Sequence, residues 1–197
     1  MTLRLVVLAS GGGTNLQAIL DAVADGSLDA QVVAVVSDRP GARALTRAAH
    51  AAVPAISMPV ELGETRCAYD RRLNEAVQVF TPDYVVLAGW MRLLSMSFLE
   101  HYPMRVLNLH PSLPGEFPGT NAIERALQAH QRLGIARTGV MVHFVPDEGV
   151  DDGPVIATVE VPIALDETLA SLEQRVHDAE HKLLVEALRS LSRPPVE

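Results

Sequence analysis

Asn108 and His110 are the side chains best placed for acid–base chemistry, because they lie two residues apart in an apolar segment that begins at Val106. In an extended strand, residues two apart point to the same side. An asparagine amide can donate a hydrogen bond to an oxygen that gains negative charge. An imidazole titrates near pH ~6.5 and can exchange protons near neutrality. The pair therefore indicates proton transfer beside a developing oxyanion, and the alternative of a histidine satisfied by backbone at a turn stays open.

An acidic loop follows further along the chain, with carboxylates at Asp147, Glu148, Asp151 and Asp152. Most acids in loops are solvated or cap a turn. A carboxylate that reached His110 would orient its imidazole and stabilise the protonated form. Spacing along the chain leaves open whether this loop approaches His110.

A glycine-rich turn, Gly11-Gly12-Gly13-Thr14-Asn15, separates the apolar segment 3–9 from a helical pattern. Glycines let a backbone approach a ligand closely, and free N–H groups at a helix start favour an anion such as phosphate. We expect Thr14 or Asn15 to cap the helix. The turn lacks the lysine of a P-loop and the third glycine of a dinucleotide fingerprint. A phosphate site is therefore predicted, with a tight turn before a capped helix as the alternative.

The remaining polar candidates carry weaker signals. His177 and His181 are four residues apart, as in a helical metal pair, but no third ligand is near them in the sequence. We therefore expect no metal, with His177 on a polar helix face and His181 in a core or supporting role. His143 has no local motif around it, and Arg92 follows a predicted strand at the ligand edge or is a surface arginine.

The elements that must position these residues alternate between strand and helix. Apolar and β-branched runs predict strands at 3–9, 31–37, 55–58, 84–88, 106–109, 139–145 and 155–161. Helical spacing predicts helices at 16–26, 42–52, 65–80, 97–102, 122–129 and 168–191. Repeated β-α-β order predicts an α/β fold: a Rossmann-like, mostly parallel sheet with helices on both faces and a C-terminal antiparallel pair. Ligands of such sheets bind outside the carboxyl ends of the strands.

Length and composition limit the classes of protein that this chain can be. Its 197 residues suit a single domain, 1–197, and 48% of them are hydrophobic. A net charge of -8 argues against nucleic-acid binding, which needs clustered bases. No apolar run is long enough for a membrane span or a secretory signal. The single cysteine, Cys67, excludes a disulfide framework, and we expect a cytoplasmic protein.

These segments together resemble the phosphoribosylglycinamide formyltransferases, folate-dependent enzymes of purine synthesis. The matching segments follow the family's order over nearly the whole chain: ASGGGTNLQAI (9–19), TRCAYDRRL (65–73), PDYVVLAGWMRLLS (82–95), VLNLHPSL (106–113), VHFVPDEGVDDGPVI (142–156) and RVHDAEHKL (175–183). The Asn-x-His-Pro-Ser segment is shared with other formyl-tetrahydrofolate enzymes, whereas the glycine loop in a compact chain is more specific. The resemblance implies the formyltransferase fold.

The resemblance also implies a reaction and its catalytic residues. The amine of glycinamide ribonucleotide would attack the formyl carbon of 10-formyltetrahydrofolate, the cosubstrate, through a tetrahedral intermediate. Asn108 would hold the formyl oxygen, His110 would stabilise the oxyanion and move the proton, and Asp151 would sustain the protonated imidazole. Asp151 is preferred to Asp152 because it aligns with the acid of Val-Asp-x-Gly-Pro.

The binding residues follow from the same matching. The resemblance assigns the substrate phosphate to Gly12, Gly13, Thr14 and Asn15, and the ribose hydroxyls to Glu180. It assigns the folate site to Arg66, Met91, Arg92, Leu93 and Leu94, with Asn108 beside the formyl group. Both partners are small molecules, and monomer and homodimer stay open.

Three positions depart from the family's usual pattern. The run Leu113-Pro114-Gly115-Glu116 has its proline displaced by one position, and Glu116 stands where a base is common. His177 fills a position that is often lysine.

Other functions stay open. A formyltetrahydrofolate hydrolase shares the catalytic trio but usually has an N-terminal regulatory domain and His-His-Ser in place of His110-Pro111-Ser112. Formyl transfer to initiator tRNA would need an additional basic domain. A non-catalytic nucleotide-binding module would use the glycine loop and leave His110 structural.

Overall fold

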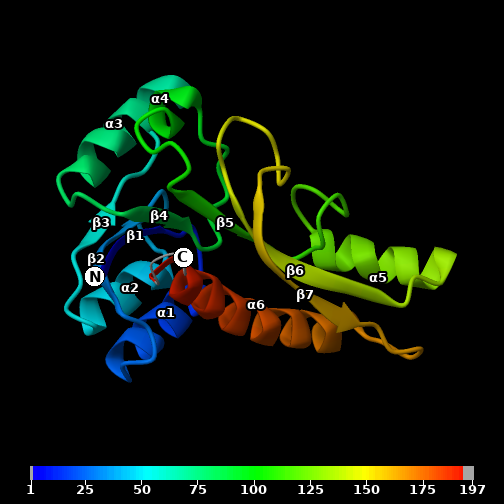
Figure 1. Ribbon diagram of the computed structural model, residues 1–197. Helices are drawn as coiled ribbons and strands as arrows, with labels where there is room; N and C mark the ends of the chain where they lie inside the picture. Colours follow the sequence, from blue (N-terminus) through cyan, green and yellow to red (C-terminus); the bar gives the residue numbers. More distant parts are fainter. Residues whose placement is uncertain (1, 193–197) are drawn as a thin grey trace, which may run out of the picture.

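The computed structural model describes residues 2–192 and alternates strands with helices (Figure 1). The strands are β1 (Leu3–Leu8), β2 (Ala30–Ser37), β3 (Ala55–Ser57), β4 (Tyr84–Leu87), β5 (Val106–His110), β6 (Arg137–Phe144) and β7 (Val155–Pro162). The helices are α1 (Thr14–Ala24), α2 (Arg43–His50), α3 (Arg66–Gln78), α4 (Met96–Leu99), α5 (Ala122–Leu133) and α6 (Leu169–Ser192). Every predicted segment overlaps the corresponding element.

All seven strands form one sheet in the order β3-β2-β1-β4-β5-β6-β7. The first five strands pair in parallel, while β6 pairs antiparallel with both β5 and β7. The predicted mostly parallel sheet with a C-terminal antiparallel pair is confirmed.

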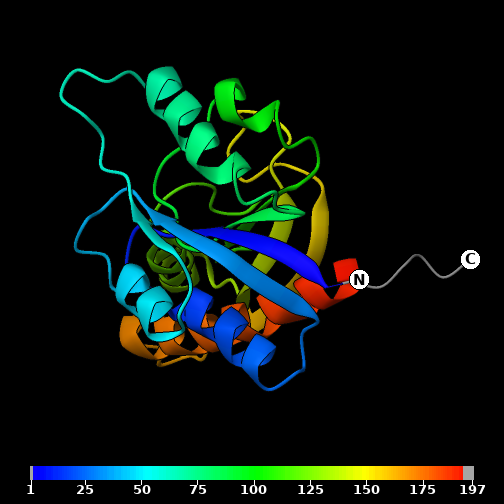
Figure 2. The same cartoon turned by 90° about the vertical axis from the view of Figure 1, so that its left-hand side faces the viewer.

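Helices cover both faces of the sheet and divide the core into two clusters (Figure 2). On β1, Leu5 and Val7 face the side of α1, α2, α5 and α6, whereas Val6 and Leu8 face α3 and α4. Because successive strand residues alternate between faces, a strand covered on both sides must be apolar throughout. The continuous apolar run at the start of the chain is thereby explained.

The strand order reverses between β1 and β4, and the loops that follow these two strands lie together. Ser10 N–H donates to the carbonyl of Gly89 at 3.0 Å, and Met91 N–H donates to Ser10 Oγ at 3.0 Å. A crevice outside the carboxyl ends at such a reversal is where open α/β sheets bind ligands. The fold therefore brings the glycine loop next to the segment after β4.

Among the helix ends that differ from the sequence expectation, the start of α1 and the end of α5 have clear physical causes. Helix α1 begins at Thr14 with Gly13 as its N-cap at φ 70, and no side chain caps it, so the expected cap by Thr14 or Asn15 is wrong. Helix α5 continues to Leu133, which is 80% exposed, before Gly134 ends it at φ 70. Apolar spacing cannot detect a last turn that faces solvent.

No helix within residues 2–192 is long and apolar enough to cross a membrane.

Candidate active site

Strand β5 presents Asn108 and His110 on one face, at its carboxyl end. The face is shared with Val106, which packs in the cluster under α3 and α4. His110 is 5% exposed and Asn108 is half-buried. The predicted common orientation of the two side chains agrees with the geometry.

Asp151 reaches this pair from the loop between β6 and β7. Its Oδ2 lies 3.3 Å from His110 Nδ1, and its Oδ1 accepts a hydrogen bond from Asn108 Nδ2 at 2.9 Å. The adjacent acid, Asp152, is exposed, and its carboxylate packs beside Gly149. Asn108, His110 and Asp151, distant along the chain, thus form a continuous amide–imidazole–carboxylate cluster.

Several groups stabilise Asp151 as an anion. Its backbone has φ 54, which directs the carboxylate inward, and Oδ2 also accepts from Gly119 N–H at 2.8 Å. Burial acts to raise the pKa of Asp151, but the neighbouring His143 ring, the Gly119 hydrogen bond and the charge on His110 outweigh it. The pKa of Asp151 therefore lies below its usual value, and the carboxylate is ionised at neutral pH.

The His110 imidazole lies between two acceptors. Asp151 Oδ2 faces Nδ1, and the carbonyl of Phe117 lies 3.1 Å from Nε2. Burial lowers the pKa of His110, while the Asp151 charge and the Phe117 hydrogen bond oppose that shift. A neutral imidazole has one N–H, so it can donate to only one of these oxygens, whereas the imidazolium donates to both. The site thus provides acceptors for a proton that His110 gains.

His143 joins the cluster, although no local motif surrounds it in the sequence. It lies on β6 directly opposite Asn108, and its Nε2 is 3.2 Å from Asn108 Nδ2 and 3.6 Å from Asp151 Oδ1. Its Nδ1 is 2.8 Å from the Phe144 carbonyl, which can only accept, so Nδ1 carries hydrogen. Nε2 lies within reach of both the Asn108 amide and the Asp151 carboxylate, so it accepts from the amide when it carries no hydrogen and donates towards Asp151 when it does.

Asn108 uses its amide nitrogen within the cluster. Nδ2 donates both to Asp151 Oδ1 and towards His143 Nε2. If the Asn108 amide were turned by about 180°, its Oδ1 would face the Asp151 carboxylate, and both groups are acceptors. The orientation with Nδ2 facing Asp151 is therefore the one that forms a hydrogen bond. A substrate oxygen that binds Asn108 Nδ2 must therefore replace one of these two partners.

The glycine loop lies against α2 through its carbonyl groups. The Gly11 carbonyl accepts from Ala44 N–H at 3.1 Å, and the Gly12 carbonyl accepts from Arg47 Nε at 2.9 Å. Within residues 2–192, no hydrogen bond occupies the N–H groups of Gly11, Gly12 or Gly13. These groups and the start of α1 are free to bind an anion.

Glu180 lies beside this loop on α6 and is 6% exposed. Burial raises its pKa to about 7, while a hydrogen bond with the Asn15 side chain acts in the opposite direction. His177 Nε2 is 4.0 Å from Glu180 Oε2, and the His177 side chain is half exposed, as expected for a polar helix face. The packing of α1 against α6 thus joins the loop to a buried carboxyl group.

Comparison with known proteins gives a clear relationship. Residues 3–188 match the family described as Formyl transferase. The chain is 43% identical to the phosphoribosylglycinamide formyltransferase of Schizosaccharomyces pombe, over 97% of this chain and 98% of the relative. It is 40% identical to the phosphoribosylglycinamide formyltransferase of Dictyostelium discoideum, over 98% of this chain and 99% of that relative.

A solved structure, glycinamide ribonucleotide transformylase 1 from Geobacillus kaustophilus, superposes with a TM-score of 0.90. It is 43% identical, and the match covers 97% of this chain and 99% of that one. The chain belongs to the formyl transferase family.

The residues of this formyl transferase expected to line a folate site are divided between surface and core. Met91 and Leu93 are more than half exposed, whereas Leu94 is buried. The Arg92 guanidinium lies 4.5 Å from the centre of the Tyr69 ring. Met91 and Leu93 are thus apolar side chains at the surface, where a ligand can contact them.

Arg66 pairs with Glu148, from the same loop as Asp151. The other oxygen of that carboxylate accepts from Met96 N–H at 3.0 Å, at the start of α4. Glu148 therefore fastens the Asp151 loop to α3 and α4, a role that loop composition did not reveal.

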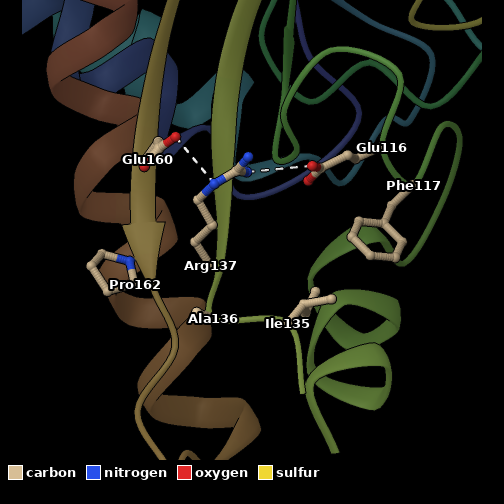
Figure 3. A pocket seen from close by; sticks show the side chains of 7 residues that line it. All are labelled: Glu116, Phe117, Ile135, Ala136, Arg137, Glu160 and Pro162. Atoms are coloured by element: carbon tan, nitrogen blue, oxygen red, sulfur yellow. Dashed lines mark hydrogen bonds and ion pairs between the residues drawn. The ribbon is translucent and has the colours of Figure 1, made fainter. Parts of the chain in front are cut away.

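The loop 113–117 borders a separate cavity of about 650 Å³ through Glu116 and Phe117 (Figure 3). Arg137 crosses it with ion pairs to Glu116 at 3.3 Å and Glu160 at 3.1 Å. Glu116, where the resemblance led us to expect a base, thus has a cationic partner on β6. Within residues 2–192, none of Asn108, His110, His143 and Asp151 lines this cavity, and its lining residue Phe117 contacts the cluster through the carbonyl that faces His110.

Among the described residues 2–192, no three His, Cys, Asp or Glu side chains are arranged so that they could hold a metal ion.

Gly13→Ala is expected to lower the free energy of unfolding by about 2–4 kcal/mol, through a left-handed φ and a steric clash. A Cβ at Gly13 would lie 2.8 Å from both Cα and Cβ of Ala44. Gly12→Ala is the matched control, since a Cβ there meets nothing within 4 Å. Chemical denaturation of both variants measures the difference, and equal stabilities would contradict the close packing of the loop on α2.

Proposed function

We propose that this protein transfers the formyl group of 10-formyltetrahydrofolate to the amine of glycinamide ribonucleotide, in purine biosynthesis. The observation that carries the proposal is the cluster of Asn108, His110 and Asp151 at the same sheet edge as the glycine loop, in a formyl transferase. The names of its relatives, which are phosphoribosylglycinamide formyltransferases, support the choice of acceptor.

In this mechanism the substrate amine attacks the formyl carbon directly. A C–N bond forms, and the formyl oxygen becomes negatively charged in the tetrahedral intermediate. The positive charge of protonated His110 stabilises that oxygen, and Asn108 turns one Nδ2 hydrogen towards it from its present partners. The bond to N10 of the folate then breaks, tetrahydrofolate takes up a proton at N10, and the amine loses one.

Asp151 acts through His110 in this proposal. Its ionised carboxylate, 3.3 Å from Nδ1, favours the imidazolium that the intermediate requires. Burial of His110 works against protonation, so the histidine can also release its proton during the cycle. Opposing influences on one imidazole suit a group that gains and loses a proton in each turnover.

The substrates would occupy the two sides of the cluster. The phosphate would bind at Gly12, Gly13, Thr14 and Asn15, and Glu180 would accept hydrogen bonds from the ribose. The folate would lie along Met91 and Leu93, with Arg66, Arg92 and Leu94 around it. Both partners are small molecules, nucleic acid and membrane take no part, and we propose the cytoplasm as the location because a single cysteine suits a reducing compartment.

Purified protein is expected to convert 10-formyltetrahydrofolate to tetrahydrofolate only when glycinamide ribonucleotide is present. The absorbance of the folate product and the mass of the formylated ribonucleotide measure the two halves of the reaction. Folate turnover without the amine would identify a hydrolase instead. Binding of both ligands without turnover would identify a non-catalytic module.

A further inference from the structure

Arg47 connects the glycine loop to helix α1 through its guanidinium. Nε donates to the Gly12 carbonyl at 2.9 Å, and Nη1 donates to Gln17 Oε1 at 2.9 Å. Gln17 Nε2 donates in turn to Asp21 Oδ1 at 2.7 Å. The planar guanidinium is thereby fixed at two of its nitrogens, which a flexible surface arginine would not be.

The contacts of α2 determine where the loop amides point. In a trans peptide the C=O of one residue and the N–H of the next point in opposite directions. The Gly11 carbonyl points to Ala44 N–H and the Gly12 carbonyl points to Arg47, so the N–H groups of Gly12 and Gly13 point away from α2. Without Arg47, the peptide between Gly12 and Gly13 loses the partner that sets its orientation.

Arg47 also brings positive charge to the loop. A groove of about 230 Å³ runs beside the first turns of α1 and is lined by Thr14, Gln17, Ala18, Asp21, Arg47 and His181. In the part of the chain that the structure describes, Arg47 is the one arginine or lysine that hydrogen bonds to loop 10–15. In a chain of net charge -8, this guanidinium opposes the repulsion of an anion.

We propose that Arg47 is a positioning residue for a phosphate monoester bound at the glycine loop. It holds the Gly12 and Gly13 N–H groups towards the ligand and supplies positive potential behind them. This inference rests on the proposed function in taking that phosphate to be the one carried by glycinamide ribonucleotide.

The test compares Arg47→Met, which removes charge and donors but keeps an apolar stem, with Arg47→Lys, which keeps the charge and one donor. Arg43→Met is the matched control, because Arg43 is an exposed arginine one turn earlier on α2. Calorimetry measures the Kd of inorganic phosphate, and steady-state kinetics measure KM for each substrate. Arg47→Met is expected to weaken phosphate binding and raise KM for the ribonucleotide by at least about tenfold, with a much smaller change in kcat.

Arg47→Lys is expected to recover phosphate binding to within about threefold of the parent, and Arg43→Met to stay within about twofold. Three results would overturn the proposal: a parent protein that does not bind phosphate, unchanged phosphate binding in Arg47→Met, or KM values that rise equally for both substrates as the unfolding midpoint falls. Because calorimetry requires no turnover, phosphate binding by a parent protein without transferase activity would refute the proposed function and still test Arg47.

Discussion

His110→Ala is expected to lower kcat by about 10²–10⁴-fold, the range typical for loss of a general acid–base group. The imidazole contacts Asp151 at Nδ1 and the Phe117 carbonyl at Nε2, so its removal abolishes the proton shuttle and one of the partners of the Asp151 carboxylate. KM for each substrate should change less, because neither the glycine loop nor the exposed Met91 and Leu93 depends on His110. Single-turnover kinetics with both substrates saturating would measure the chemical step directly.

His110→Asn separates catalysis from folding. Its amide can still donate towards Asp151 but cannot exchange a proton near neutrality, so the fold should be retained while kcat stays low. Circular dichroism and the thermal midpoint of both variants provide the control. A kcat within about threefold of the parent in either variant would remove His110 from the mechanism.

The fold could be predicted because its elements have local causes. Strands covered on both faces need continuous apolar runs, as in segment 3–9, and helices show the spacing of their buried stripe. Asn108 and His110 could be paired for a similar reason, since two residues of one strand share a face whatever the rest of the chain does. The glycine loop was found because it follows a strand directly, where the sheet places its ligands.

The remaining members of the cluster depend on tertiary geometry. His143 meets Asn108 only through the register between β5 and β6, which the composition of either strand does not specify. Asp151 reaches Asn108 across 43 positions of the chain by means of a left-handed backbone at φ 54. The resemblance to known enzymes selected Asp151, whereas spacing left four acids equivalent. Likewise Arg47 contacts the glycine loop from α2, whereas the loop itself leads into α1. No sequence pattern around the glycines therefore indicates that Arg47 lies beside them.

Asp151→Asn is expected to lower kcat by at least about 10²-fold while preserving the size of the side chain. The carboxylate now accepts hydrogen bonds from Asn108 Nδ2 and Gly119 N–H and faces His110 Nδ1. An asparagine has one acceptor oxygen, so its NH₂ group must face one of these donors. The substitution also removes the negative charge that favours the His110 imidazolium.

The pH dependence of this variant distinguishes a charge effect from a loss of shape. Burial already lowers the pKa of His110, and the Asp151 charge raises it again. Without that charge the pKa of His110 falls further. As the pH is raised, the variant therefore loses the His110 imidazolium at a lower pH than the parent does. The ratio of variant to parent kcat should therefore increase as the pH is lowered, as long as the protein stays folded.

Asp152→Asn is the matched control for Asp151→Asn, because it removes the same charge from the next, exposed residue. Its kcat and pH profile should stay within about twofold of the parent, since a solvated charge is screened. If the Asp151→Asn deficit were the same at every pH, the carboxylate would not act by sustaining the imidazolium, and its contribution would lie in holding Asn108 and Gly119. If both variants lost activity equally, the cause would be the charge of the loop as a whole, and the pairing of Asp151 with His110 would have no special part in catalysis.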